Sequence, residues 1–240
     1  MHVMQNRFRT NVVSSSEFED GCSNQKSADA CFSLGEWQQL IAKDEPKAAE
    51  LYADNCMDRS HASSCFNLAM LLLSKRIEVP AKLSGKEEPH DVVARKLLRR
   101  SCELKDGAHS QACSAFATVC LSGTGGPRDV KTGIEVLSKL CDPPHNDARA
   151  CVKLGSAFLR GEATYPGVIK DIKAAHEKMK RACDELGHPN GCQVLAVMYS
   201  KGDGVEKDEK LAQKYRDMTK DLIVKTGEKL GSVSVDPTPQ

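Results

Sequence analysis

Cysteine forms the clearest chemical pattern in this 240-residue sequence. Ten of the eleven cysteines fall into five pairs, and eight to ten residues separate the two members of each pair. Thiols at this spacing can form disulfides, bind a metal ion or pack as small apolar side chains. The eleventh, Cys120, is left over as a candidate reduced thiol. The pairs are Cys22 and Cys31, Cys56 and Cys65, Cys102 and Cys113, Cys141 and Cys151, and Cys183 and Cys192.

The cysteine pairs recur with the period of a helical repeat. The second cysteines of successive pairs are 34 to 48 residues apart, a spacing typical of solenoid proteins. After the last pair, an apolar pattern at helical spacing leads to Gly202 and Gly204, which permit a tight turn, and then to Asp208, which can cap a second helix. We therefore predict an all-α fold, a right-handed solenoid of about five helix-turn-helix hairpins whose cysteine pairs span the loops between hairpins.

The same pattern predicts where the domain begins and ends. We expect residues 1–21 to form a disordered N-terminal tail, 22–226 the repeat domain, and 227–240 a disordered C-terminal tail. Within the second repeat, the polar segment RIEVPAKLSGKEEPHD contains two prolines and a glycine, so it should be a surface excursion. The predicted repeats are about 31–64, 65–112, 113–150, 151–191 and 192–226.

Composition excludes several classes of function. The sequence has 34 basic and 33 acidic residues, so its net charge is close to neutral and provides no electrostatic attraction for nucleic acid. No apolar run reaches the ~18 residues that span a bilayer, and the first residues lack the apolar segment of a secretory signal. Arg7 and Arg9, with serines after them and no acid before Glu17, faintly resemble a mitochondrial presequence; the alternative is a plain disordered tail.

Several short motifs link the sequence to a known family. They are Cys-x-x-Leu-Gly at Cys31–Gly35 and Cys151–Gly155, Gly-x-Gly-Val at Gly202–Val205, and Asp171 followed by Lys173 and Ala174. Together they resemble the Sel1-like repeat, a relative of the tetratricopeptide repeat, over about residues 22 to 223. The five cysteine pairs, with CFNL at Cys65–Leu68 and KGDGVEKDE at Lys201–Glu209, are most similar to the mitochondrial cytochrome c oxidase assembly factor seven family.

The resemblance implies a non-catalytic scaffold in the assembly of respiratory-chain complex IV. It implies residence in the mitochondrial intermembrane space, with partners among complex IV assembly proteins and the intermembrane-space disulfide relay. A monomer without a transmembrane segment is expected. The family is also thought to bind haem through histidine and methionine, and His176 with Met179 is a candidate pair here, although no family ligand can be carried onto this sequence.

Loop length and the resemblance both favour five disulfides. A loop of eight to ten residues between two helices can bring two Cα atoms within the ~5.5 Å that a disulfide needs. In the chain-entropy model, closing a ring of about ten residues contributes roughly 3 kcal/mol. Disulfides require an oxidising compartment, and the intermembrane space satisfies this requirement without a secretory signal.

Zinc binding and redox exchange are alternative uses of the same cysteines. His61, His109 and His188 each precede a cysteine by four residues, which places candidate zinc ligands together, although no fourth ligand is nearby. Reduced cysteines that only pack are a further alternative. Cys120 could serve a thiol-disulfide oxidoreductase, but a buried thiol is the simpler interpretation.

A lactam-hydrolase activity is a minor alternative, since some bacterial proteins with this cysteine-rich repeat hydrolyse lactams weakly. Ser23 and Lys26 match its Ser-x-x-Lys element, and Lys-Thr-Gly occurs at 131–133 and 225–227. Lys-Thr-Gly belongs on a strand in those enzymes, whereas Lys131 lies in a helix pattern here. We therefore predict no catalytic residue and no metal site.

Overall fold

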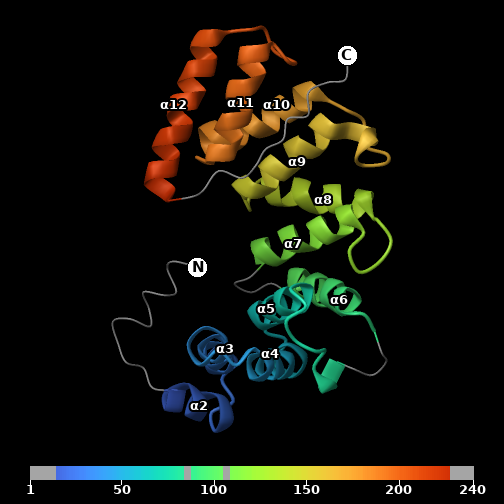
Figure 1. The fold of residues 1–240 in the computed structure, drawn as a ribbon, viewed down its shortest axis with the longest axis vertical. Helices are drawn as coiled ribbons and strands as arrows, with labels where there is room; N and C mark the ends of the chain where they lie inside the picture. The colour runs from blue at the N-terminus through green and yellow to red at the C-terminus, as the bar shows by residue number, and fades with distance from the viewer. Residues whose placement is uncertain (1–14, 84–87, 105–108, 228–240) are drawn as a thin grey trace. The chain divides into compact units, whose positions relative to one another are not determined.

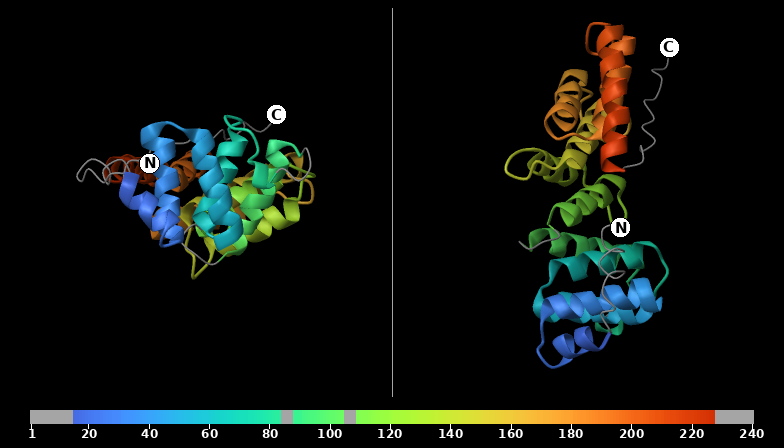
Figure 2. Two further views of the ribbon diagram at one scale, coloured as in Figure 1. Left: turned by 90° about the horizontal axis from the view of Figure 1, so that it is seen from below. Right: turned by 90° about the vertical axis from the view of Figure 1, so that its left-hand side faces the viewer.

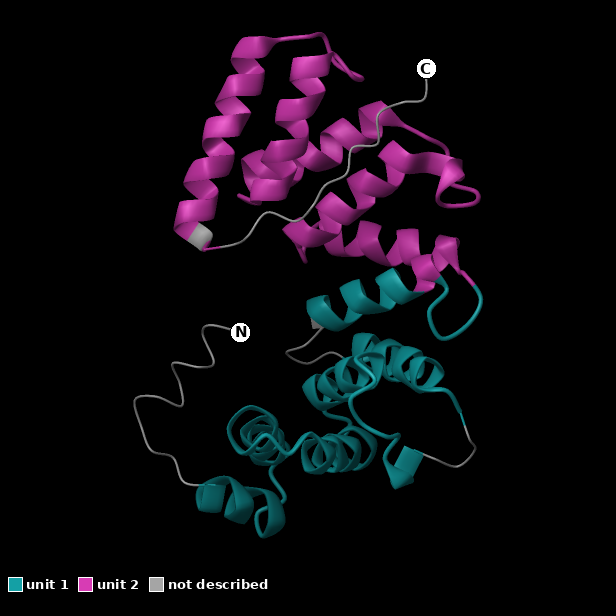
Figure 3. Cartoon of the chain, viewed as in Figure 1, with its two compact units in different colours: residues 1–119, 123–127 teal, residues 120–122, 128–240 magenta. Residues whose placement is uncertain are grey.

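The computed structural model describes residues 15–83, 88–104 and 109–227, and these residues form helices, turns and loops without any β-strand. They belong to two compact units, residues 1–119 with 123–127 and residues 120–122 with 128–240 (Figure 3). The all-α prediction is confirmed for the described residues.

In the first unit, consecutive helices from α2 to α6 pack against one another along the chain. Two short elements, a π-helical turn that continues α3 and a 3₁₀ turn before α6, complete it. In chain order the elements are α2 (Ser15–Ser23), α3 (Ala28–Trp37), η1 (Gln38–Ala42), α4 (Glu45–Arg59), α5 (Ala62–Leu73), η2 (Ala81–Leu83), α6 (His90–Glu103) and α7 (His109–Ser122), whose last three residues belong to the second unit (Figure 1).

The second unit repeats the same arrangement. Consecutive helices from α8 to α12 pack against one another, and α12 lies alongside α11 as the last helix of the unit (Figure 2). Its elements are α8 (Val130–Cys141), α9 (Ala148–Arg160), η3 (Gly161–Ala163), α10 (Ile172–Lys180), η4 (Arg181–Glu185), α11 (Pro189–Lys201) and α12 (Glu209–Thr226).

An aspartate begins the second helix of four hairpins. Its carboxylate accepts hydrogen bonds from backbone N–H groups in the first turn, which have no partner within the helix. The predicted cap Asp208 is confirmed, since its Oδ1 accepts from the N–H groups of Lys210 and Leu211 at 2.8 and 3.0 Å. The equivalent caps are Asp44 on α4, Asp129 on α8 and Asp171 on α10.

Small residues allow the two helices of a hairpin to approach closely. A Cβ atom at Gly35 would lie 2.4 Å from Cε1 of Tyr52, and one at Gly155 would lie 3.2 Å from the carbonyl oxygen of Ala175. These are the glycines of the two Cys-x-x-Leu-Gly motifs. Their role is therefore to let α4 pack on α3 and α10 pack on α9.

Each unit has an apolar core along the contact surfaces of its helices. In the first unit, Tyr52, Leu68, Leu72 and Leu98 are fully buried. In the second unit, the largest fully buried side chains are Leu137, Leu140, Leu154, Met179, Val194 and Leu195.

Two segments differ from the sequence predictions. Residues 15–21, assigned to a tail, form most of α2, which packs on α3; a Cβ at Gly21 would lie 2.7 Å from that of Ala30. The insertion of the second repeat is only partly a surface excursion, because Ile77 and Pro80 are buried and Lys82 pairs with Asp54, at 2.9 Å, and with Asp58. The predicted tails at 1–14 and 228–240 lie outside the described residues.

Candidate functional site

The structure brings together both members of every predicted cysteine pair. Their Cα atoms are 4.5 to 4.9 Å apart and their sulfur atoms are bonded. One cysteine of each pair lies at or near the end of a helix, and the other lies in the first two turns of the helix that begins the next hairpin. The pairs therefore crosslink successive hairpins. Oxidation of the ten cysteines in the native compartment stays a prediction.

Cys120 lies outside these crosslinks. It is fully buried within α7, seven residues after Cys113, and its carbonyl oxygen accepts a hydrogen bond from the N–H of Asp129 at 2.9 Å. A thiol with no exposed surface cannot meet a disulfide of another protein unless the helix moves. This buried position agrees with the simpler interpretation of Cys120 as a buried thiol that packs in the core.

Two of the three histidines proposed as zinc ligands cap helices instead. Nδ1 of His61 accepts from the N–H of Ser64 at 3.3 Å at the start of α5, and Nδ1 of His188 accepts from the N–H of Asn190 at 3.2 Å at the start of α11. The neighbouring cysteines are bonded to each other. In the described ranges, no group of three or more His, Cys, Asp or Glu residues is arranged to hold a metal ion. The side chain of His109 lies outside the part of the chain that the structure describes.

The candidate haem pair does not form a binding site. Met179 is fully buried against α9, and its methyl group would be 3.0 Å from a Cβ at Gly155. Nε2 of His176 is 3.1 Å from the hydroxyl oxygen of Tyr199 on α11. Since the thioether is part of the core while the imidazole contacts a tyrosine, the two side chains do not fit an axial pair for haem.

His176 instead belongs to a row of polar and aromatic contacts that joins α10, α11 and α12. The rings of Tyr199 and Tyr215 stack with centroids 5.7 Å apart, and the Tyr215 hydroxyl donates to Asp184 at 3.3 Å. Burial, followed by the positive charge of Lys180, lowers the pKa of His176 below its usual value. Burial, followed by the negative charge of Asp184, raises the pKa of Tyr215 to about 12. Both shifts favour the neutral forms of His176 and Tyr215, so this row joins the last three helices through uncharged rings.

The elements of the lactam-hydrolase alternative lie in ordinary helical positions. Lys131–Gly133 forms part of the first turn of α8, where the N–H of Thr132 donates to Asp129 at 3.0 Å. Ser23 is the last residue of α2. Lys225 and Thr226 end α12. In the described part of the chain, therefore, Lys-Thr-Gly is nowhere on a strand.

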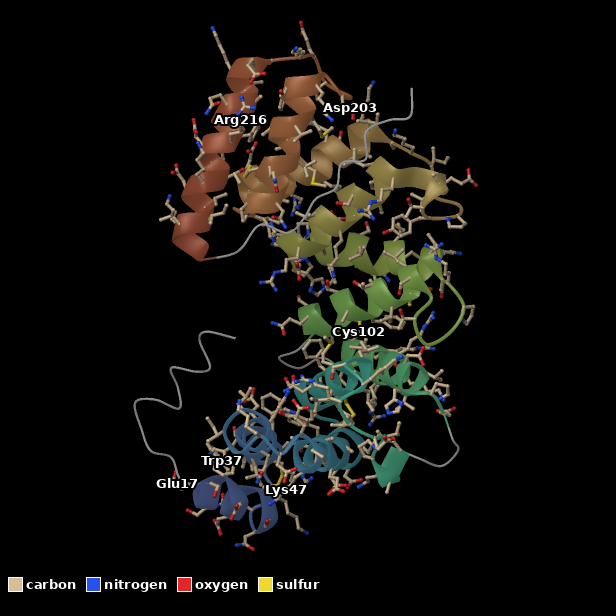
Figure 4. All side chains as sticks on the ribbon, viewed as in Figure 1. Glu17, Trp37, Lys47, Cys102, Asp203 and Arg216 are labelled. Carbon is tan, nitrogen blue, oxygen red and sulfur yellow. A yellow bond between two sulfur atoms is a disulfide. The ribbon has the colours of Figure 1, made fainter. Side chains whose placement is uncertain are left out.

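Sequence reasoning missed a groove between α11 and α12. It has a volume of about 430 Å³ and is lined by residues one helical turn apart on each helix (Figure 4 labels Arg216). A signal was present in the sequence, because Lys220 stands where the equivalent residue of every earlier hairpin is cysteine. The lining residues are Gln193, Ala196, Val197, Ser200, Lys201, Arg216, Thr219, Lys220 and Ile223.

The helical hairpins place the chain in a class of proteins, the helical-repeat proteins of the Sel1 type. The Sel1 repeat model matches residues 28–53, 148–185 and 189–215. Among solved structures, a Sel1 repeat protein from Oxalobacter formigenes superposes with a TM-score of 0.69 at 18% identity, covering 91% of this chain and 81% of that one. A protective antigen of uropathogenic Escherichia coli with an SLR fold gives 0.68 at 18% identity, covering 85% and 40%. The predicted fold class is confirmed.

Curated relatives narrow the class to a family. The cytochrome c oxidase assembly factor 7 homolog of Drosophila melanogaster is 30% identical over 236 residues, covering 86% of this chain and 85% of the relative. Cytochrome c oxidase assembly factor 7 of Xenopus tropicalis is 29% identical over 210 residues, covering 86% and 84%. The human protein of that name is 28% identical over 204 residues, covering 84% and 82%. The chain belongs to the cytochrome c oxidase assembly factor 7 family.

Proposed function

We propose that the chain is a non-catalytic protein-interaction scaffold for the assembly of cytochrome c oxidase. The observation that carries the proposal is the extent of the family match. Relatives named for this assembly align with 84 to 86% of the chain, so the similarity covers most of the array of hairpins and not one motif. Repeats of this kind present extended surfaces to other proteins.

A mitochondrial location follows from the same role, and we place the chain in the intermembrane space. Ten cysteines at disulfide distance support this compartment, because persistent disulfides need an oxidising environment. The disulfide relay of that compartment is the partner that would oxidise them. No helix in the described ranges is long and apolar enough to cross a membrane. We expect a monomer, which light scattering after size exclusion can verify.

Loss and rescue of the gene test the scaffold role. Cells that lack the protein should contain less fully assembled cytochrome c oxidase on native gels, and expression of the wild-type chain should restore it. Rescue by Cys120→Ser should be equal, because a scaffold does not need a reactive thiol there. Normal enzyme levels without the protein would refute the assembly role, and failure of Cys120→Ser despite normal folding would favour redox chemistry.

Thiol counting tests the crosslinks and the compartment. Protein from intact mitochondria should react with one equivalent of alkylating agent after unfolding and with eleven after reduction, as measured by intact mass. Protease should degrade it in mitoplasts but not in intact mitochondria. Eleven reactive thiols without reduction would contradict both the disulfides and the intermembrane-space location.

A further inference from the structure

The repeat register assigns the groove between α11 and α12 to a specific packing position. Twelve residues after each capping aspartate of α4, α8 and α10 comes a cysteine that is bonded to the next hairpin, namely Cys56, Cys141 or Cys183. The residue twelve positions after Asp208 is Lys220. The groove is therefore the surface on which the first helix of a further hairpin would pack.

The equivalent surface of α10 shows how closely a helix can approach this position. There α11 packs so tightly that a Cβ at Gly191 would lie 2.9 Å from the Cβ of Ala182 and 3.0 Å from the carbonyl oxygen of Met179. On α12, Thr219 is equivalent to Ala182, and Arg216 is equivalent to Met179. The position thus accepts a helix by its geometry, but its side chains are more polar than those of α10.

The chemistry of the groove selects among helices. Ala196, Val197 and Ile223 supply apolar surface, whereas Lys201, Arg216 and Lys220 are basic, and no lining residue is acidic. Arg216 pairs with Glu209, and Lys220 lies 3.3 Å from Asp217, but these carboxylates are more than half exposed and do not line the groove. Such exposed pairs exchange readily for other carboxylates. Gln193 is another lining residue, and its Oε1 is buried without a hydrogen-bond partner.

We propose that this groove binds an amphipathic α-helix of a partner protein, with small apolar residues along one face and Asp or Glu beside it. The helix takes the place that the first helix of a sixth hairpin would take. Its carboxylates pair with Lys201 and Lys220. The proposal rests on the scaffold function and specifies one surface that serves it.

A charge-swap experiment with a designed peptide tests the proposal on the full-length oxidised protein. The probe is a labelled 18-residue helix with Ala and Leu on one face and Glu at both flanks; its counterpart carries Lys at the flanking positions. Fluorescence anisotropy should show the Glu peptide binding at least tenfold more tightly than the Lys peptide. Lys201→Glu with Lys220→Glu should invert this preference, and binding of the Lys peptide then proves that the variant is folded.

Lys210→Glu with Lys214→Glu is the matched control. Both residues lie on α12, so the net charge of the same hairpin changes equally while the lining residues stay as they are. It should leave the preference for the Glu peptide in place. Equal binding of the two peptides, or loss of the preference in the control, overturns the proposal.

Two other results would assign the groove to a different occupant and also overturn the proposal. One is a dimer that dissociates when Lys201 and Lys220 are both replaced by glutamate. The other is a gain of at least tenfold in peptide affinity when residues 228–240 are deleted. All of these assays use purified protein, so they can fail while the gene-rescue experiment succeeds, and the reverse also holds.

Discussion

Replacing Gly35 with alanine should destabilise the first unit, although alanine is the better helix former. A Cβ at this position would lie 2.4 Å from Cε1 and 2.9 Å from Cδ1 of Tyr52. The ring cannot simply move aside, because it is fully buried and its hydroxyl bonds to Gln39 at 3.1 Å and to Asn67 at 3.3 Å. Overpacking of this kind costs ~1–3 kcal/mol. The gain in helix propensity offsets about 1 kcal/mol, so a net loss of up to ~2 kcal/mol is expected.

A double-mutant cycle with Tyr52→Leu checks the cause of the loss. Urea unfolding of the oxidised protein, followed by circular dichroism, gives the free energy of unfolding of the four variants. Gly35→Ala should be neutral or stabilising when Tyr52 is leucine, with a coupling energy of at least ~1 kcal/mol. An equal loss in both backgrounds, or stabilisation by Gly35→Ala in the wild-type background, would refute the close contact between α3 and α4.

Three further predictions concern crosslinks, caps and pH. Replacing Cys141 and Cys151 together by alanine should lower the free energy of unfolding by roughly 3 kcal/mol, as estimated from the loop length; an unchanged urea midpoint under oxidising conditions would show that this bridge does not form. Asp208→Ala should cost ~0.5–2 kcal/mol in thermal or urea unfolding because two N–H groups lose their acceptor, while the exposed Glu206→Ala should cost almost nothing, and equal effects would rule out the cap. Burial lowers the pKa of His176 in the folded state. The neutral imidazole therefore contributes fully to stability above the unfolded pKa of ~6.5, and this contribution is lost as the pH falls below that value. His176→Gln should flatten the curve of stability against pH between pH 7.5 and 5.5, and an unaltered curve would contradict the assignment.

The sequence alone determined the features that depend on neighbours along the chain. Asp208 caps a helix and Gly202 ends one because their partners lie within a few residues, so spacing is sufficient to predict them. The cysteine pairs are also local, since eight to ten residues join the two members. Helical hairpins, their number and their crosslinks could therefore be predicted from one sequence.

Only the tertiary structure decided which side chains are buried and by what. Met179 and His176 are three residues apart on one helix, yet the thioether lies in the core and the imidazole contacts Tyr199. Likewise, the burial of Ile77 and Pro80 in the insertion could not be read from their spacing along the chain. A side chain is buried when packing removes it from water, and the packing partners come from elsewhere in the chain. Sequence spacing gives the period of the repeat and the unusual Lys220, whereas the groove beside Lys220 is seen only once α11 and α12 are packed together.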